Sequence, residues 1–176
     1  MDKLNLKKRA AGFTLIELVV GLLIVSILAS VGSLAVVQGM KAYYAIDDAL
    51  PTLAKLRYTI SRIAWELKET DYDGSAYLLT ATYPSTANGS ITFTKLDGTA
   101  VTIDGSTSSM TMKYDAGSAY TLTDQLSDLT FNFYQYDGTT NATADTDVRF
   151  IEINVTLSLD GNTYDQRTRV GLRDPD

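Results

Sequence analysis

The chain of 176 residues contains no cysteine and no histidine. Without cysteine there is no disulfide framework, no thiolate metal site and no cysteine nucleophile. Without histidine the commonest general base is missing, and a serine–histidine catalytic arrangement is excluded. No glycine-rich loop of the kind that cradles phosphates follows an expected strand. These absences predict a protein that is not an enzyme and that needs no cofactor.

Basic residues are fewer than acidic ones, 15 against 21. Four of the basic residues, among them Lys7, Lys8 and Arg9, lie within the first twelve residues beside a single acid, Asp2. The rest of the chain is therefore more acidic than its formal net charge of −6 suggests. An acidic surface repels phosphate backbones, so we expect no direct nucleic acid binding.

One stretch, residues 13–37, is apolar almost throughout. About 20 such residues suffice for a helix that crosses the roughly 30 Å hydrocarbon layer of a membrane. The stretch is longer than the apolar part of a secretory signal, and helical sequence continues beyond it. The basic residues ahead of it predict that this end stays in the cytoplasm and that the body of the protein is exported.

A single carboxylate, Glu17, lies inside this apolar stretch. An ionisable group within a membrane span costs about 2.5 kcal/mol or more and usually has a partner. The simpler alternative is that Glu17 extends to the cytoplasmic headgroups, which its place one turn inside the span would permit.

Residues 12–20, with the sequence GFTLIELVV, resemble the processing signature of type IV pilins and of the pseudopilins of type II secretion. The resemblance implies that a prepilin peptidase cuts after Gly12 and methylates the new amino terminus at Phe13. It implies that Glu17 recognises a neighbouring subunit and that Lys7, Lys8 and Arg9 belong to a removed leader. The implied partners are other pilin or pseudopilin subunits, the peptidase, an inner-membrane assembly platform and, before assembly, the lipid bilayer.

The role of Glu17 also has a physical argument. A new ammonium group at Phe13 would be the nearest cation at the same membrane depth, but the two groups are poorly placed to meet within one helix. In a staggered array, Glu17 of an incoming subunit would neutralise the Phe13 amine of its predecessor, and a low dielectric strengthens that attraction. Such a pair would set the register of assembly.

The helical period continues over residues 38–70 with one apolar and one polar face. Pro51 predicts a kink or a restart near Leu50, and Trp65 is expected at a rim or an interface. The apolar face is predicted to form core at Leu53, Leu56, Ile60, Ile63 and Leu67. The polar face carries Lys41, Asp47, Asp48, Lys55, Arg57, Arg62, Glu66 and Lys68.

Residues 71–176 change to short segments rich in threonine, tyrosine and β-branched residues, separated by glycine, asparagine and aspartate. Asp97 and Gly98 fit a type I′ hairpin turn. A second turn is predicted at Asp160 to Asn162. The expected strands are 91–96, 99–103, 109–114, 119–123, 129–136, 150–159 and 163–172. A long N-terminal helix packed on a C-terminal antiparallel sheet predicts an α+β fold.

The predicted segments are therefore a leader at 1–12, a transmembrane and filament-core helix at 13–37, its amphipathic continuation at 38–70, and a β-rich periplasmic or extracellular domain at 71–176. The strand at 129–136, the loop after it and the hairpin formed by 150–159 and 163–172 also loosely resemble the corresponding parts of J-type pseudopilins and W-type minor pilins.

Calcium is the one metal for which the sequence offers candidates. Asp137, Asp145 and Asp147 lie in one loop and supply the hard oxygen ligands that calcium prefers. Their spacing matches no calcium motif, and a solvated hairpin loop explains them more simply.

The function predicted from these observations is a structural minor subunit of a type IV pilus or a type II secretion pseudopilus. It would be held first in the cytoplasmic membrane and then in a filament at the cell surface. The main alternative is an adhesin-like pilin that binds a carbohydrate or a protein through its tyrosine-rich β domain. A third is a single-span membrane protein with an unrelated exported domain, which holds only if the leader is not removed.

Overall fold

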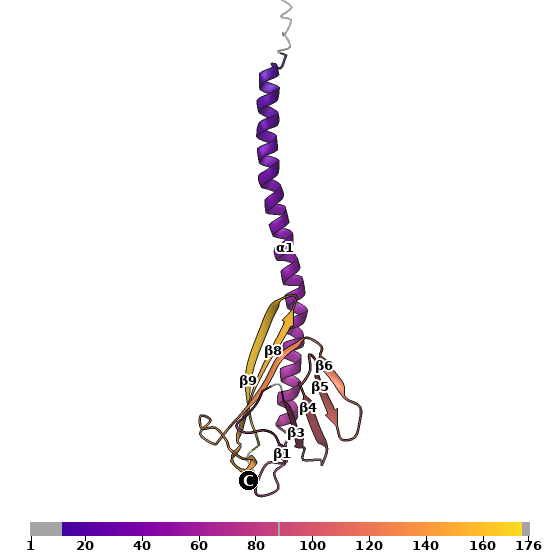
Figure 1. Ribbon diagram of the computed structural model, residues 1–176, viewed down its shortest axis with the longest axis vertical. Coiled ribbons are helices and arrows are strands. Elements are labelled where there is room, and N and C mark those ends of the chain that lie inside the picture. The colour runs from indigo at the N-terminus through magenta and orange to yellow at the C-terminus, as the bar shows by residue number, and fades with distance from the viewer. Residues whose placement is uncertain (1–11, 88, 174–176) are drawn as a thin grey trace, which may run out of the picture. The chain divides into compact units, whose positions relative to one another are not determined.

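The computed structural model of the chain describes residues 12–87 and 89–173 (Figure 1). It divides into two compact units, the first ending at Asp47 and the second beginning at Asp48. Among the described residues, the first unit contains the N-terminal part of one helix and no strand, and the second combines the remaining helical turns with all the strands. The expected α+β class is confirmed, with a long N-terminal helix and antiparallel strands.

The helix α1 runs without interruption from Leu15 to Leu67 and contains Pro51. Of the predicted kink or restart near Leu50, the restart is therefore wrong, and the kink stays a prediction. Proline removes one hydrogen bond from a helix, but the turns that follow it pack into the second unit, where Thr52 and Leu56 are each 1% exposed. Tertiary packing of a helix face outweighs such a local defect.

The strands form two antiparallel sheets rather than the single sheet expected. A five-stranded sheet has the order β1-β3-β4-β5-β6, and a four-stranded sheet has the order β2-β7-β8-β9. The strands are β1 (Leu79–Thr80), β2 (Ser85–Ala87), β3 (Ser90–Thr94), β4 (Ala100–Asp104), β5 (Met110–Tyr114), β6 (Tyr120–Thr123), β7 (Leu126–Tyr134), β8 (Phe150–Leu159) and β9 (Asn162–Gly171). Figure 1 shows β8 and β9 as a long paired ribbon.

The core of the second unit combines one face of α1 with alternate residues of both sheets. The helix contributes Leu56, Ile60, Ile63 and Leu67, all fully buried as predicted, whereas Leu53 is only half-buried. The two sheets contribute Ile91, Phe93, Val101, Ile103, Met110, Met112, Leu129, Phe131, Phe133, Ile151, Ile153, Val155 and Leu157. Trp65 is exposed, as expected for a rim position.

The two predicted hairpin turns differ in outcome. Asp160 (φ 50°) and Gly161 (φ 80°) form the two-residue loop between β8 and β9, and left-handed φ at both positions is the type I′ requirement. The type I′ turn at Asp97 and Gly98 is wrong, because Gly98 has positive φ (85°) and Asp97 does not. The loop has three residues, closed by a 2.8 Å bond from the Gly98 amide to the Lys95 carbonyl. This is the pattern of a turn followed by a glycine bulge.

Glu66, which the helical pattern placed on the polar face, is fully buried. Its Oε1 lies 2.6 Å from Arg62 Nη2 and accepts a 2.6 Å hydrogen bond from the Tyr114 hydroxyl. Its Oε2 forms an ion pair with Lys95 Nζ at 3.1 Å. Lys95 follows β3 and Tyr114 ends β5, so the five-stranded sheet reaches across this side of the helix and covers the carboxylate.

Candidate functional site

The N-terminus of α1 is closed by its own side chains. Thr14 Oγ1 accepts a hydrogen bond from the Glu17 amide at 3.3 Å, and Glu17 Oε2 accepts bonds from the Thr14 amide at 3.4 Å and the Thr14 hydroxyl at 3.3 Å. This reciprocal arrangement is a capping box, which satisfies amides that a helix start leaves without partners. The spacing of Thr14 and Glu17 matches the capping-box pattern, a signal that the sequence interpretation did not use.

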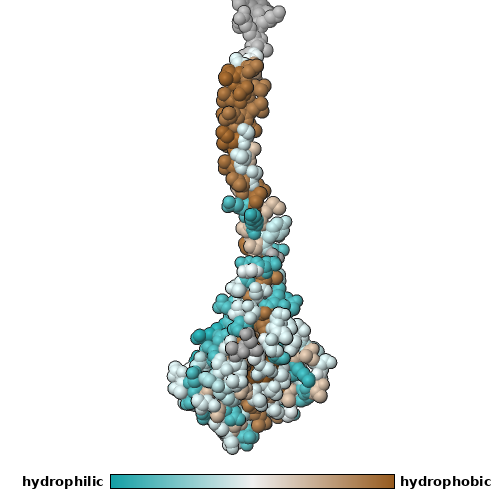
Figure 2. All heavy atoms as spheres, in the orientation of Figure 1, coloured by the Kyte–Doolittle hydropathy of each residue, from teal (hydrophilic) through white to brown (hydrophobic). Residues whose placement is uncertain are grey.

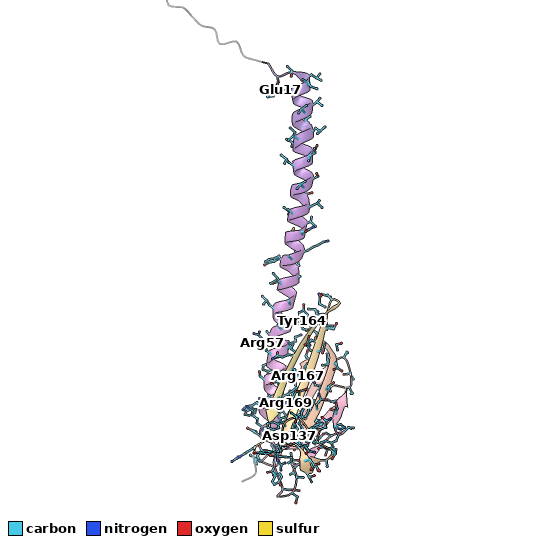
Figure 3. The ribbon with its side chains drawn as sticks, turned by 90° about the vertical axis from the view of Figure 1, so that its left-hand side faces the viewer. Glu17, Arg57, Asp137, Tyr164, Arg167 and Arg169 are labelled. Carbon is cyan, nitrogen blue, oxygen red and sulfur yellow. The ribbon has the colours of Figure 1, made fainter. Side chains whose placement is uncertain are left out.

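Gly12 and Phe13, the predicted processing and methylation positions, lie just before this helix start. Both are exposed, Phe13 to 82%. Figure 3 shows Glu17 at the same end of the helix. Lys7, Lys8 and Arg9, the basic residues of the predicted leader, lie outside the described residues. Phe13 and Glu17 are therefore four residues apart at the start of the helix, and both side chains are exposed.

The helix segment that follows has no cover from its own chain. By length and composition, α1 is long and apolar enough to cross a membrane, and none of its apolar window is buried within the described structure. Figure 2 shows this part of the helix as a mainly hydrophobic surface with a narrow pale strip along it. Its exposed apolar side chains include Leu15, Ile16, Leu18, Leu22, Leu23, Ile24, Val25, Ile27, Leu28, Val31 and Leu34. Such a surface is stable only in lipid or against other apolar helices.

The serine hydroxyls within this segment are satisfied by the helix itself. The hydroxyls of Ser26, Ser30 and Ser33 each donate a 2.8 Å bond to the carbonyl three residues earlier. In lipid, polar groups need internal partners of this kind. Residues 15–37 therefore present mainly hydrocarbon to their surroundings, and Glu17 is the one charged side chain among them.

The three calcium candidates are engaged in local turns. Asp137 accepts bonds from the amides of Thr139 and Thr140 and from the Thr140 hydroxyl at 2.5–2.9 Å, and these bonds, led by the hydroxyl, hold the pKa of its carboxyl well below the usual range. Asp145 caps the Thr146 amide, and Asp147 accepts bonds from neighbouring threonine hydroxyls. Across residues 12–87 and 89–173, no three acidic side chains gather as a metal site would require. The geometry gives no support to calcium binding here.

A polar cluster on the outer face of the four-stranded sheet was not predicted. Glu152 of β8 is only 3% exposed because two arginines of β9 cover it: Arg169 Nη2 lies at 2.9 Å and Arg167 Nε at 3.2 Å from its Oε2. Burial alone would raise the pKa of Glu152, but the bond from Arg169 and the charge of Arg167 outweigh it and lower the pKa. Figure 3 shows both arginines along β9.

Arg169 extends this cluster to the neighbouring loop. It donates a 2.7 Å bond to the Gly138 carbonyl and lies over the Tyr134 ring at 4.4 Å. The cluster therefore ties the edge strand β9 to β7, β8 and the loop after β7. The two arginines, two residues apart on one strand face, were the sequence signal for it.

Comparison with known families places one motif on this helix. A family model described as Prokaryotic N-terminal methylation motif matches residues 7–33. This is the signal of type IV pilins and pseudopilins, and it implies processing by a prepilin peptidase and assembly with other pilin subunits. It suggests a structural rather than an enzymatic protein. Searches of curated proteins and of solved structures found no match.

Proposed function

We propose that the chain is a prepilin-type filament subunit that is cut after Gly12, methylated at Phe13 and assembled through the N-terminal half of α1. The observation that carries this proposal is the coincidence of the methylation motif at 7–33 with a helix start at Leu15 and an apolar helix that its own chain leaves uncovered. Residues 1–12 would be the leader and residues 13–37 the membrane span and later the filament core.

We further propose a minor subunit of a type IV pilus or a type II secretion pseudopilus. What supports this finer assignment is the resemblance of β7, the loop after it and the terminal hairpin of β8 and β9 to J-type pseudopilins and W-type minor pilins. The soluble unit would face the periplasm before assembly, and an inner-membrane platform would receive the subunit.

In the proposed assembly, Glu17 changes partners. Its capping bonds are 3.3–3.4 Å long and come from neutral donors, whereas an ammonium donor carries a full charge and binds a carboxylate at a shorter distance. The methylated amine at Phe13 of an assembled subunit would therefore displace the Thr14 hydroxyl as the main partner of an incoming Glu17. The low dielectric of the membrane increases this preference.

Mass spectrometry of the protein purified from its native membrane tests the processing step. We expect a terminus at Phe13 that carries one extra methyl group. A Gly12→Leu variant should remain unprocessed, because the peptidase would need the small residue at the cut. An intact Met1 terminus in the unaltered protein would remove the filament-subunit proposal.

Two substitutions at Glu17 separate charge pairing from helix capping. Glutamine keeps an oxygen that accepts the capping bonds but has no charge, and alanine has neither. We expect both Glu17→Gln and Glu17→Ala to insert in the membrane and both to lose filament incorporation when they compete with unaltered subunits. Normal incorporation of Glu17→Gln would show that capping is sufficient and would refute the pairing.

A further inference from the structure

An open cleft lies on the second unit where the helix meets the five-stranded sheet. Its volume is 420 Å³, within the range of about 300–1,000 Å³ that is typical of small-molecule sites. Tyr58 and Arg62 of α1, Met112 and Tyr114 of β5, and Tyr120 and Leu122 of β6 line it.

Two of the cleft's tyrosines are exposed although they are large aromatic residues. Tyr58 is 62% and Tyr120 is 63% exposed, one on the helix and one on the edge strand β6. The Tyr120 ring is held edge-on against Tyr114, with ring centroids 6.4 Å apart. Neither hydroxyl has a hydrogen-bond partner among the described residues. These rings therefore contribute little to the core and offer their faces and hydroxyls to a ligand.

The floor of the cleft is charged but balanced. The Arg62 guanidinium lies 2.6 Å from the buried Glu66 carboxylate, donates a 2.7 Å bond to the Tyr114 hydroxyl and lies over the Trp65 ring at 5.2 Å. Burial, followed by the bond to Glu66, raises the pKa of Tyr114, so its hydroxyl stays neutral. The arginine is held in place by these contacts and has its charge matched before any ligand arrives.

We propose that this tyrosine cleft binds a neutral sugar ring, as a site for a glycan. A pyranose has an apolar face of C–H groups that packs on an aromatic ring and a rim of hydroxyls that exchange hydrogen bonds with tyrosine hydroxyls and guanidinium N–H groups. An anionic ligand would need an unmatched cation, and Arg62 is already paired. The inference goes beyond the filament role and does not depend on it.

The test is a titration of the full chain, with its tyrosine rings isotopically labelled, by NMR in dodecylphosphocholine micelles, which contain no sugar. The probes are the methyl glycosides of glucose, galactose, mannose and N-acetylglucosamine, with methyl glucuronide as the anionic comparison. Phenylalanine substitutions assign the resonances of Tyr58 and Tyr120. We expect saturable shifts of both with at least one neutral glycoside.

Variants locate the binding. Tyr120→Ala and Tyr58→Ala each remove an exposed ring, so the fold should be retained and affinity should fall about fivefold, the equivalent of one aromatic contact. Tyr136→Ala is the matched control, because Tyr136 is also exposed (81%) but lies outside the cleft. It should leave the titration unchanged.

Several outcomes would overturn the proposal. They are no saturable shift with any neutral glycoside, a response to the glucuronide alone, shifts that persist in both cleft variants, or shifts lost in Tyr136→Ala. If the cleft resonances instead move when the protein is diluted without sugar, the cleft is a contact with a second copy and the sugar assignment falls.

Discussion

Single side chains on α1 have environments that the average helical pattern does not reveal. Glu66 and Lys68 are two residues apart in a polar stretch, yet Glu66 is fully buried and Lys68 is exposed. The burial of Glu66 is tolerated because Arg62, Lys95 and Tyr114 all contact its carboxylate. A buried charge with this many partners is costly to disturb one partner at a time.

Glu66→Gln should therefore destabilise the second unit by about 2–4 kcal/mol, since it leaves the buried end of Lys95 and the Arg62 contact without their countercharge. Urea unfolding followed by the fluorescence of Trp65, the one tryptophan of the chain, measures this directly. Glu69→Gln is the control. Glu69 also pairs with Lys95, but its side chain is 37% exposed, so its loss should cost less than about 1 kcal/mol. Equal losses would contradict the importance assigned to burial.

Lys95 makes the free energy of unfolding depend on pH in the alkaline range. Hydrogen bonding to Glu69, with a further contribution from Glu66, raises its pKa above the ordinary value of 10.5 despite the opposing effect of burial. A group whose pKa is raised on folding stabilises the protein fully below its unfolded pKa and loses that contribution as pH rises through the folded pKa. Unfolding free energy should therefore fall above about pH 10.5.

A Lys95→Met variant should be less stable at neutral pH and should show a shallower fall at alkaline pH in the same urea measurement. The remaining alkaline sensitivity belongs to Tyr83, whose pKa burial raises to about 12, and to Tyr114, whose pKa burial also raises. A variant with the same alkaline slope as the unaltered protein would show that Lys95 does not cause it.

At the scale of elements, the two sheets meet through close contacts between loops and strands. Gly105 directly follows β4, and a Cβ atom there would lie 2.5 Å from Leu129 Cδ2 of β7 and 3.1 Å from Leu126 Cδ2. Leu129 is fully buried, so it has little freedom to move aside. The absence of a side chain at Gly105 allows the end of one sheet to approach the other.

Gly105→Ala should cost about 1–3 kcal/mol, the range for overpacking a well-packed core. Thermal or urea unfolding measures the loss. Ser106→Ala is the neighbouring control, because Ser106 is exposed and its recorded bond, to Asp104, uses the backbone amide. If both substitutions are neutral, the sheets are not packed as closely as described.

Elements with a regular pattern were predictable from the sequence, and short or irregular ones were not. Strand β8 occupies residues 150–159 as predicted, because its apolar residues alternate over its whole length. Strands β1 and β2 have two and three residues, too few to show a period. The separation into two sheets follows from β2 pairing with β7, a long-range contact that no local pattern encodes. The turn at Gly98 was missed because an aspartate–glycine pair fits both two-residue and three-residue loops.

The part of the candidate site that lies in one short sequence motif was predictable, and the parts that depend on the fold were not. The positions of Gly12, Phe13 and Glu17 follow from a linear motif. Other features depend on which strand lies beside which, and residue spacing in the sequence could not predict them. They are the burial of Glu66 and Glu152 and the grouping of Tyr58, Tyr114 and Tyr120 in one cleft.

At the scale of the whole molecule, the two units differ in what stabilises them. The second has a core of its own, whereas the described side chains of the first are exposed throughout. We therefore expect residues 41–176 to be soluble and cooperatively folded without detergent, and the full chain to require lipid or detergent.

Size-exclusion chromatography and circular dichroism of the two proteins test this difference. The fragment should elute as a discrete species with a cooperative thermal transition, and the full chain should aggregate when detergent is removed. A fragment without a transition would show that the N-terminal half of the helix is needed for the soluble unit to fold.

The serines of α1 whose hydroxyls bond to the helix backbone have a consequence for filament composition. Because the hydroxyls of Ser26, Ser30 and Ser33 donate to their own backbone, lateral neighbours would meet no free hydroxyl donor along residues 15–37. Selectivity would then rest on shape and on one terminal charge. A heteropolymer of several related chains, each with a hydrocarbon helix of similar width, would be built as readily as a homopolymer.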